Sequence, residues 1–155
     1  MDEHLHLTEG ESVNRFELDG IPCGSIICYD LRFPELTRTL ALSGAQVLFV
    51  PAQWPNPRLY HWKTLLAARA IENQMAVVAC NRMGSSIGDH GEVTSFFGHS
   101  MIIDPWGEVT ASAADEEIIL TGKINLEQIP DVRSRIPVFK DRKPHIYHLG
   151  AQANQ

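Results

Sequence analysis

The sequence predicts an α/β fold, in which helices pack around central strands. The main observation is that strand-like and helix-like segments alternate along the middle of the chain. The strand-like segments are almost wholly apolar, as strands covered on both faces are. The chain also has 155 residues, 44% of them hydrophobic, which suits one domain with a sizeable core. We therefore expect residues 1–155 to form a single domain.

The first predicted elements are two strands joined by a tight turn. Arg15–Leu18 and Ile21–Tyr29 have the composition of strands, and Asp19-Gly20 between them is a typical hairpin dipeptide. The second of these segments ends at a sharp polar break, Asp30-Leu31-Arg32.

Two helices and two further strands follow in alternation. Pro34 suits the first position of a helix that is expected to run to about Ser43. A second helix is expected from Arg58 to about Asn73, where apolar residues recur at helical spacing. The apolar segments Ala45–Val50 and Met75–Cys80 are predicted to be buried strands.

The last third of the chain predicts mainly strands and turns. Its Gly/Ser-rich segment Gly84–Gly91 has the composition of a loop. Further elements are expected as strands at Ser100–Ile103, Glu108–Ala111 and Ile118–Ile124 and as a short helix at Leu126–Val132. The tail from Pro137 is basic and is expected to be irregular.

Composition and charge exclude several classes of function. The formal net charge is -6, which argues against a nucleic-acid-binding surface. No apolar run approaches the roughly 20 residues of a membrane helix. The acidic, polar beginning is the opposite of a signal peptide. Three cysteines, an odd number, fit a reducing compartment, so we expect a cytoplasmic protein.

Cys28 is the strongest candidate for a catalytic residue. It is expected where a buried strand meets a tight turn into a helix, so that its sulfur projects from the sheet edge. Backbone N–H groups after such a turn can stabilise negative charge. The alternative is a buried core cysteine, which is common in apolar strands. Cys23 and Cys80 have no such turn and are expected to be structural.

Other candidates near this turn have two interpretations each. Arg32 can hold a substrate carboxylate in a bidentate fork, or it can form an ion pair with Asp30 or Glu35. Trp54 can form the wall of a pocket, or it can be ordinary packing. His99 can form a Cys–His dyad with Cys28 or be a hydrogen-bonding histidine. No histidine has a metal-ligand spacing, and no phosphate-loop motif is present, so we expect neither a metal nor a cofactor.

At CYDLRFPE (Cys28–Glu35) the chain resembles the nitrilase superfamily of carbon–nitrogen hydrolases, whose cysteine motif is G-x-x-I-C-Y-D-x-R-F-P-E. The resemblance is closest to the omega-amidases and extends over nearly the whole chain. It continues, in order, through VPAQWP (Val50–Pro55), HWKTLLAARAIENQMAVVACN (His61–Asn81), FFGHSMIIDPWGEV (Phe96–Val109) and VRSRIPVFKDRKPHIY (Val132–Tyr147), and upstream through DEHLHLTEGE (Asp2–Glu11).

This resemblance implies a nitrilase-type αββα sandwich, incomplete here because the N-terminal strands and helices are absent. It implies that Cys28 is the nucleophile and that the backbone N–H of Tyr29 holds the oxyanion. Glu3 matches the auxiliary glutamate of the family. We expect Arg32, Phe33 and Trp54 to bind the substrate.

The sequence departs from the family at one point. The family places a general-base glutamate and an oxyanion lysine before the cysteine, but no lysine precedes Cys28 here. We therefore expect that the chain resembles the C-terminal portion of such an enzyme and has little amidase activity alone.

The expected partners are a small amide and a second copy of the chain. The predicted reaction is hydrolysis of the C–N bond of a small amide, such as a 2-oxo acid amide, through a cysteine thioester. The resemblance implies a homodimer or higher oligomer, built through the helices at Glu35–Ser43 and Arg58–Asn73, with the tail 137–155 packed on the partner subunit. The alternatives are a non-catalytic dimerising module of the same fold, and a Cys–His hydrolase that uses His99.

Overall fold

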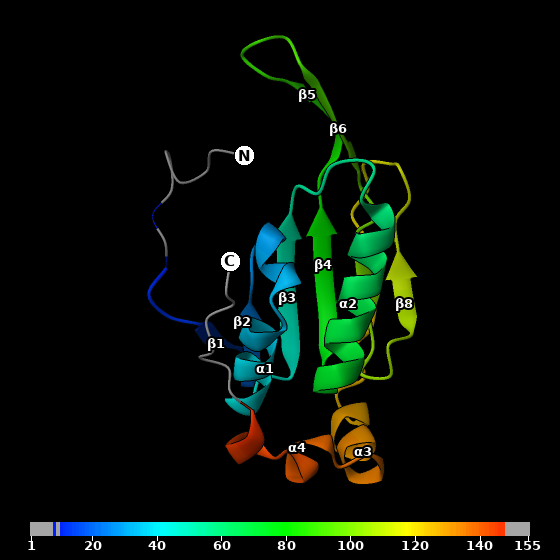
Figure 1. Ribbon diagram of the computed structural model, residues 1–155. Coiled ribbons are helices and arrows are strands. Elements are labelled where there is room, and N and C mark those ends of the chain that lie inside the picture. The colour runs from blue at the N-terminus through cyan, green and yellow to red at the C-terminus, as the bar shows by residue number, and fades with distance from the viewer. Residues whose placement is uncertain (1–7, 9, 148–155) are drawn as a thin grey trace.

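A six-stranded mixed sheet forms the centre of the computed structural model, which describes residue 8 and residues 10–147 (Figure 1). The strand order is β1-β2-β3-β4-β7-β8. The three central strands β2, β3 and β4 run parallel, and the other neighbours pair antiparallel. The bounds are β1 Asn14–Leu18, β2 Ile21–Ser25, β3 Val47–Ala52, β4 Ala76–Asn81, β7 Met101–Ile103 and β8 Val109–Ser112. The predicted α/β fold is confirmed.

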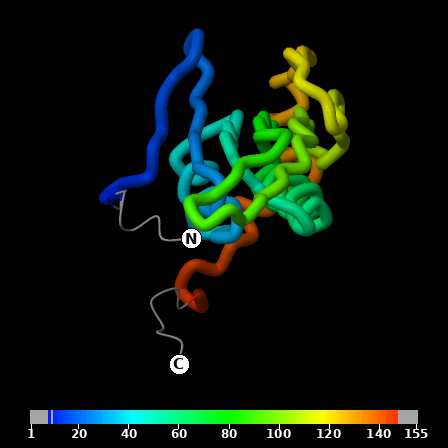
Figure 2. Tube along the Cα trace, turned by 90° about the horizontal axis from the view of Figure 1, so that it is seen from above, coloured from blue at the N-terminus to red at the C-terminus, as the bar shows by residue number. Residues whose placement is uncertain are grey.

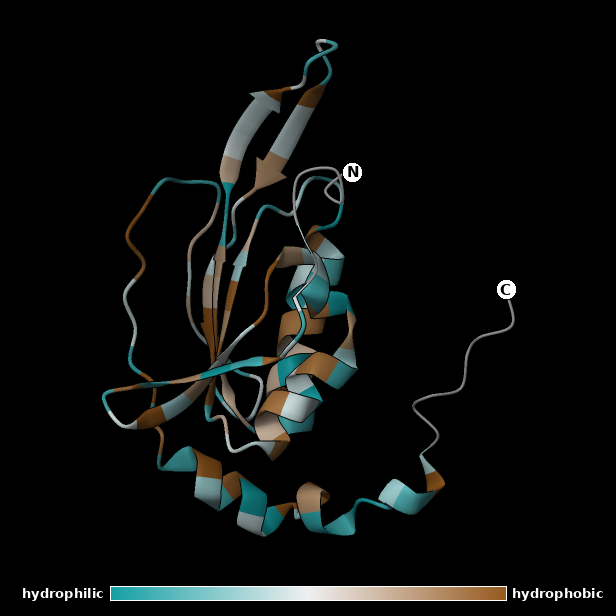
Figure 3. Cartoon of the chain, turned by 90° about the vertical axis from the view of Figure 1, so that its left-hand side faces the viewer, coloured by the Kyte–Doolittle hydropathy of each residue, from teal (hydrophilic) through white to brown (hydrophobic). Residues whose placement is uncertain are grey.

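Two helices, α1 (Pro34–Leu42) and α2 (Leu59–Asn73), cover one face of this sheet, as Figures 1 and 3 show. The main core lies between them and the strands. Its most deeply buried large side chains include those of Trp62, Leu66 and Leu48, all at 0% exposure. The parallel strands β2, β3 and β4 are connected through these helices, as parallel pairing requires.

Local residue chemistry explains several element boundaries. Asp19 and Gly20 have φ angles of 51° and 77°, and two successive positive φ angles suit the tight β1–β2 hairpin. Pro34 occupies the first turn of α1, and Gly44 follows the end of this helix with φ 98°. Figure 2 shows the β1–β2 hairpin (blue) and the segment around β8 (yellow) on opposite sides of the molecule, as the two sheet edges require.

The second face of the sheet carries a smaller apolar cluster. Cys23, Val47 and Ala76 are buried there, and partly buried Phe16, Ile21, Phe49, Val78, Ile124 and Leu126 pack against them. The segment between β8 and α3 runs along this side (Figure 3). The strand predicted at Ile118–Ile124 is wrong, because this segment pairs with no strand among the described residues. Only some apolar side chains of this segment pack against the sheet. Ile124 joins the cluster, whereas Ile119 is 90% exposed.

Two further predictions need correction. The segment Gly84–Gly91 is not simply a loop, because β5 (Met83–Ile87) pairs antiparallel with β6 (Val93–Phe97) in a hairpin that projects beyond the main sheet (Figure 1). Ile21–Tyr29 is not one strand, because β2 ends at Ser25 and a 3-10 helix, η2, spans Cys28–Arg32.

The C-terminal part of the described chain forms α3 (Gln128–Arg135), α4 (Val138–Asp141) and η3 (Pro144–Ile146). Phe139 packs here against its own chain, with the guanidinium carbons of Arg38 and Arg133 at 5.2 and 4.9 Å from its ring centre. The packing of the tail 137–155 on a partner subunit stays a prediction, and residues 148–155 lie outside the described part. Among the described residues, no helix has the length and apolarity that crossing a membrane requires.

Candidate active site

Cys28 opens the 3-10 turn η2, just beyond the end of β2 where the parallel strands also end. Cys28 is half-buried and packs against the main core cluster. The backbone at Cys28 has φ 48°, in the left-handed region that non-glycine residues seldom adopt. Such conformations cost free energy and concentrate at functional sites. The turn therefore places Cys28 just beyond the end of β2, in a backbone conformation typical of functional sites.

Three side chains, one from within and two from outside, hold the nucleophile turn, which we define as residues 27–33. Asp30 Oδ2 accepts the backbone N–H of Ile27 at 2.9 Å. The indole N–H of Trp54 donates to the carbonyl oxygen of Cys28 at 3.0 Å. The guanidinium of Arg69 donates to the carbonyl oxygen of Leu31 at 2.7 Å. These bonds fix the turn to the β3–α2 loop and to α2.

The N–H of Tyr29 lies directly after the sulfur-bearing residue. Within the described part of the chain, this N–H donates no hydrogen bond to any acceptor. The first N–H groups of a helical turn lack partners inside the turn and are available to an external acceptor. The ring of Tyr29 is exposed and packs edge-on against Phe33, with ring centres 5.4 Å apart. A backbone N–H without an acceptor among the described residues thus directly follows the thiol-bearing residue in the chain.

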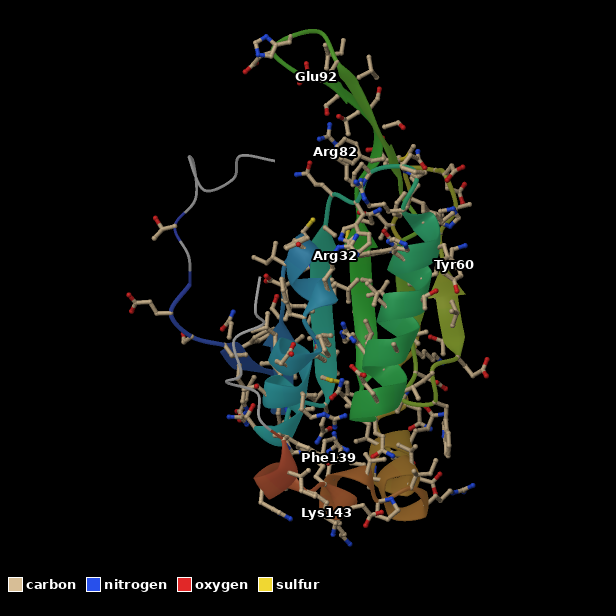
Figure 4. The ribbon with its side chains drawn as sticks, viewed as in Figure 1. Arg32, Tyr60, Arg82, Glu92, Phe139 and Lys143 are labelled. Carbon is tan, nitrogen blue, oxygen red and sulfur yellow. The ribbon has the colours of Figure 1, made fainter. Side chains whose placement is uncertain are left out.

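Arg32 lies over aromatic rings rather than beside a carboxylate. Its guanidinium carbon is 4.6 Å from the ring centre of Trp54 and 5.8 Å from that of Tyr29. The ion pairs of the described residues do not include Arg32, so the pairing with Asp30 or Glu35 that we considered is not formed there. Figure 4 shows Arg32 near the ends of β3 and β4 from which the β5–β6 hairpin projects.

Trp54 is buried, with 3% exposure, and its surroundings fix its position. Its backbone N–H donates to Asn81 Oδ1 at 2.7 Å, and Asn81 Nδ2 donates in turn to the carbonyl of Gly98 at 2.7 Å. The ring centre of Trp54 is 5.6 Å from that of Trp62. The interpretation of Trp54 as ordinary packing is thus incomplete, because its indole N–H also bonds the Cys28 backbone.

Two residues of this site carried no prediction from the sequence, Arg69 and Asn81. Both are buried polar residues, with 4% and 6% exposure. A polar residue inside an apolar helix or at the end of an apolar strand must find a partner. The sequence shows both polar residues within apolar elements. It does not show their partners, which lie far away along the chain.

The remaining candidates lie apart from Cys28 or outside the description. His99 Nε2 is 3.4 Å from Asp115 Oδ1, and no contact with Cys28 supports a Cys–His dyad. Burial raises the pKa of the Cys23 thiol, and Cys80 is exposed on β4. Glu3 lies outside the described residues. Within those residues, no three His, Cys, Asp or Glu side chains are grouped so as to hold a metal ion.

A cavity of about 370 Å³ lies elsewhere, between the end of α1 and the α3–α4 region, where it is lined by Ala41, Leu42, Gly44, Arg133, Pro137, Phe139 and Lys140. Figure 4 shows Phe139 at the end of the molecule opposite Arg32. This cavity is therefore not where Cys28 presents its sulfur.

Comparisons with known proteins identify one family. The family model described as Carbon-nitrogen hydrolase matches residues 1–134. The 2-oxoglutaramate amidase of Bacillus subtilis is 51% identical over 147 residues, which are 95% of this chain and 55% of that protein. A deaminated glutathione amidase of Rattus norvegicus is 41% identical over 80% of this chain and 37% of its own length.

Solved structures agree as well. The crystal structure of a carbon-nitrogen hydrolase from Helicobacter pylori G27 matches with a TM-score of 0.91 and 28% identity, over 97% of this chain and 56% of that one. The chain therefore spans about half the length of the curated relatives it matches.

Proposed function

The chain belongs to the carbon–nitrogen hydrolase family, and from that premise we propose that it hydrolyses the C–N bond of a small amide through a thioester on Cys28. The observation that carries the proposal is the half-buried thiol at the start of η2, next to a Tyr29 N–H that has no acceptor among the described residues. A nucleophile and an adjacent free donor are what acyl transfer requires.

The proposed reaction has two steps at the same carbon. The sulfur of Cys28 attacks the amide carbon, and the carbonyl oxygen becomes an oxyanion that accepts the N–H of Tyr29. The C–N bond breaks, the nitrogen takes the proton that the thiol has lost, and ammonia leaves. Water then attacks the thioester, which releases the acid and restores the thiol. In the resembled family a glutamate takes the thiol proton, and a lysine supplies a second oxyanion donor.

Arg32 is the proposed anchor for a substrate carboxylate. Its guanidinium stacks on Trp54 and forms no ion pair with a described residue, which leaves N–H donors for a ligand. A guanidinium fork matches a carboxylate in two hydrogen bonds. The name of the Bacillus subtilis relative denotes an amide that also bears a carboxylate. The exposed rings of Tyr29 and Phe33 supply an apolar border, so we propose a small 2-oxo acid amide as substrate.

An activated ester tests this proposal without relying on a second oxyanion donor. The purified chain is mixed with 4-nitrophenyl hemisuccinate, which carries a carboxylate, or with 4-nitrophenyl butyrate, which does not. We expect a burst of nitrophenolate that Cys28→Ala abolishes, with the acyl group found on Cys28 by peptide mass spectrometry.

The carboxylate preference provides the matched control. Arg32→Gln is expected to slow acylation by the hemisuccinate about tenfold, the effect of losing one charged hydrogen bond, with the butyrate rate unchanged. Arg82→Gln changes another arginine at the same end of the molecule, whose partner is Gln53, and should leave both rates unchanged. A burst that persists in Cys28→Ala contradicts the proposed nucleophile.

Association with a second copy is the proposal for the partner. The helices that cover the sheet expose large apolar side chains on their outer surface, including Leu42 at 46%, Tyr60 at 76% and Ile71 at 54%. Exposed large apolar side chains on a helical layer are candidates for an interaction surface. Native mass spectrometry is expected to give twice the monomer mass, and Tyr60→Glu/Ile71→Glu is expected to give the monomer. A stable monomer at micromolar concentration contradicts this proposal. A dimer without Cys28 acylation favours the non-catalytic module.

A further inference from the structure

We propose that Trp54 is a positioning residue for the nucleophile turn: its indole N–H fixes the carbonyl of Cys28 and thereby directs the N–H of Tyr29 toward the reacting oxygen. This inference rests on the proposed function, because it gives the Tyr29 N–H the oxyanion role. The contact that carries it is the 3.0 Å hydrogen bond from Trp54 Nε1 to the oxygen of Cys28.

The physical link is the planarity of one peptide unit. The carbonyl of Cys28 and the N–H of Tyr29 belong to the same trans peptide, so they point in opposite directions. A bond that holds the carbonyl therefore also sets the direction of the N–H. This matters here because Cys28 has φ 48°, a conformation that persists only where surrounding contacts impose it.

Trp54 is rigid enough to impose that direction. It is 3% exposed, its backbone N–H is held by Asn81, and Asn81 is itself bonded to Gly98. Its ring packs on Trp62, whose own indole N–H donates to the carbonyl of His99 at 2.9 Å. Two neighbouring buried tryptophans thus each bond a backbone carbonyl, but only Trp54 bonds the peptide that follows the nucleophile.

Two thiol reagents separate an oxyanion effect from a change in the thiol itself. With acrylamide, the sulfur bonds to the terminal carbon of the C=C bond, and the electron pair moves onto the amide oxygen before the adjacent carbon takes a proton. With iodoacetamide, the S–C bond forms as the C–I bond breaks, and the charge leaves as iodide. Only the first reaction develops an oxyanion, so only the first gains from a directed N–H donor.

The experiment measures both rates at Cys28 and, in the same molecule, at exposed Cys80, by quantitative peptide mass spectrometry. In the wild-type chain, the ratio of the acrylamide rate to the iodoacetamide rate should be roughly tenfold higher at Cys28 than at Cys80. Trp54→Phe should lower the ratio at Cys28 to that of Cys80. Trp62→Phe loses an equivalent indole hydrogen bond. This variant should keep the higher rate ratio at Cys28.

An isosteric change guards against simple misfolding of Trp54→Phe. In a Trp62→Phe/Trp106→Phe chain Trp54 is the sole tryptophan, and benzothienylalanine incorporated in its place puts sulfur where the N–H was, with nearly the same shape. This substitution is expected to lower the ratio of the acrylamide rate to the iodoacetamide rate at Cys28 as Trp54→Phe does. A ratio that survives both changes at position 54 overturns the positioning role. Equal ratios at Cys28 and Cys80 in the wild-type chain instead overturn the oxyanion role of Tyr29, and the positioning role with it.

Discussion

The guanidinium of Arg69 bonds the carbonyl oxygen of Leu31 at 2.7 Å, which ties α2 to the last part of the nucleophile turn, 38 residues earlier in the chain. Arg69 is 4% exposed and Leu31 is 0% exposed, so neither group has ready access to water. A second nitrogen of Arg69 bonds Glu72 at 2.9 Å. The position of the turn over the core thus depends on a buried charged hydrogen bond.

Replacing Arg69 should destabilise the protein strongly. Arg69→Met keeps much of the volume but leaves the buried carbonyl of Leu31 without a donor. We expect the free energy of unfolding to fall by about 2–3 kcal/mol, the usual effect of losing a buried hydrogen bond to a charged group. Urea unfolding followed by circular dichroism measures this change.

Arg135→Met serves as the matched control for Arg69→Met. Arg135 pairs with Asp131 at 3.0 Å, but its side chain is 66% exposed. Exposed ion pairs contribute little, so this variant should lie within about 0.5 kcal/mol of the wild type. If the free energy of unfolding fell equally in the two variants, the hydrogen bond from Arg69 to Leu31 would contribute no more to stability than an exposed ion pair.

The sequence was sufficient for the elements that local patterns specify. The Asp19-Gly20 turn, the start of α1 at Pro34 and the alternation of strands with α1 and α2 were all predicted, and the structure confirms them. The cysteine motif also led to the right family, which the family model supports. In each case the signal lies within a few residues or within one contiguous motif.

The rest depended on contacts between distant residues. The apolar run up to Tyr29 suggested one long strand, yet β2 ends at Ser25 because bonds from Trp54 and Arg69 hold the following residues in a turn. Likewise β5 is rich in glycine and serine and has little strand propensity of its own. Its pairing comes from β6, whose valine, threonine and phenylalanines favour a strand.

The strained backbone at Cys28 makes a stability prediction of its own. At φ 48° a side chain is disfavoured, whereas glycine is tolerated. Cys28→Gly is therefore expected to be about 1 kcal/mol more stable than Cys28→Ala in urea unfolding. At Cys80, within β4, the order should reverse, because glycine weakens a strand. If Cys28→Ala were more stable than Cys28→Gly, the result would contradict a left-handed backbone conformation at this position.

The buried thiol of Cys23 predicts a pH dependence of stability. Burial raises the pKa of this thiol above its ordinary value of 9.0, and a backbone hydrogen bond from Leu18 lowers it by less. As the pH rises past that ordinary value, the unfolded chain loses the thiol proton while the folded chain keeps it. Stability from this group is thus fully present below about pH 9 and is lost as the pH rises toward the folded pKa.

Comparison with Cys23→Ala isolates this effect from the lysines and tyrosines that titrate nearby. The wild type should lose stability more steeply as the pH rises above about 9, by at most about 1.4 kcal/mol per pH unit, the limit for one proton. Urea unfolding at several pH values gives both curves. Parallel curves would mean that the Cys23 thiol ionises equally in the folded and unfolded chain.

The 155-residue chain is expected to turn over a true amide far more slowly than an activated ester. Loss of a single oxyanion donor costs about 10²–10³ in rate, and no lysine precedes Cys28 in this sequence. An ester that releases nitrophenolate needs no proton for its leaving group, whereas an amide needs both the proton and a well-stabilised oxyanion. Ammonia release from 2-oxoglutaramate should therefore be barely measurable, although acylation by 4-nitrophenyl hemisuccinate proceeds. Amide turnover of about 1–10³ s⁻¹, the ordinary range of enzymes, would contradict this prediction and show that the 155-residue chain supplies the charge stabilisation that the reaction requires.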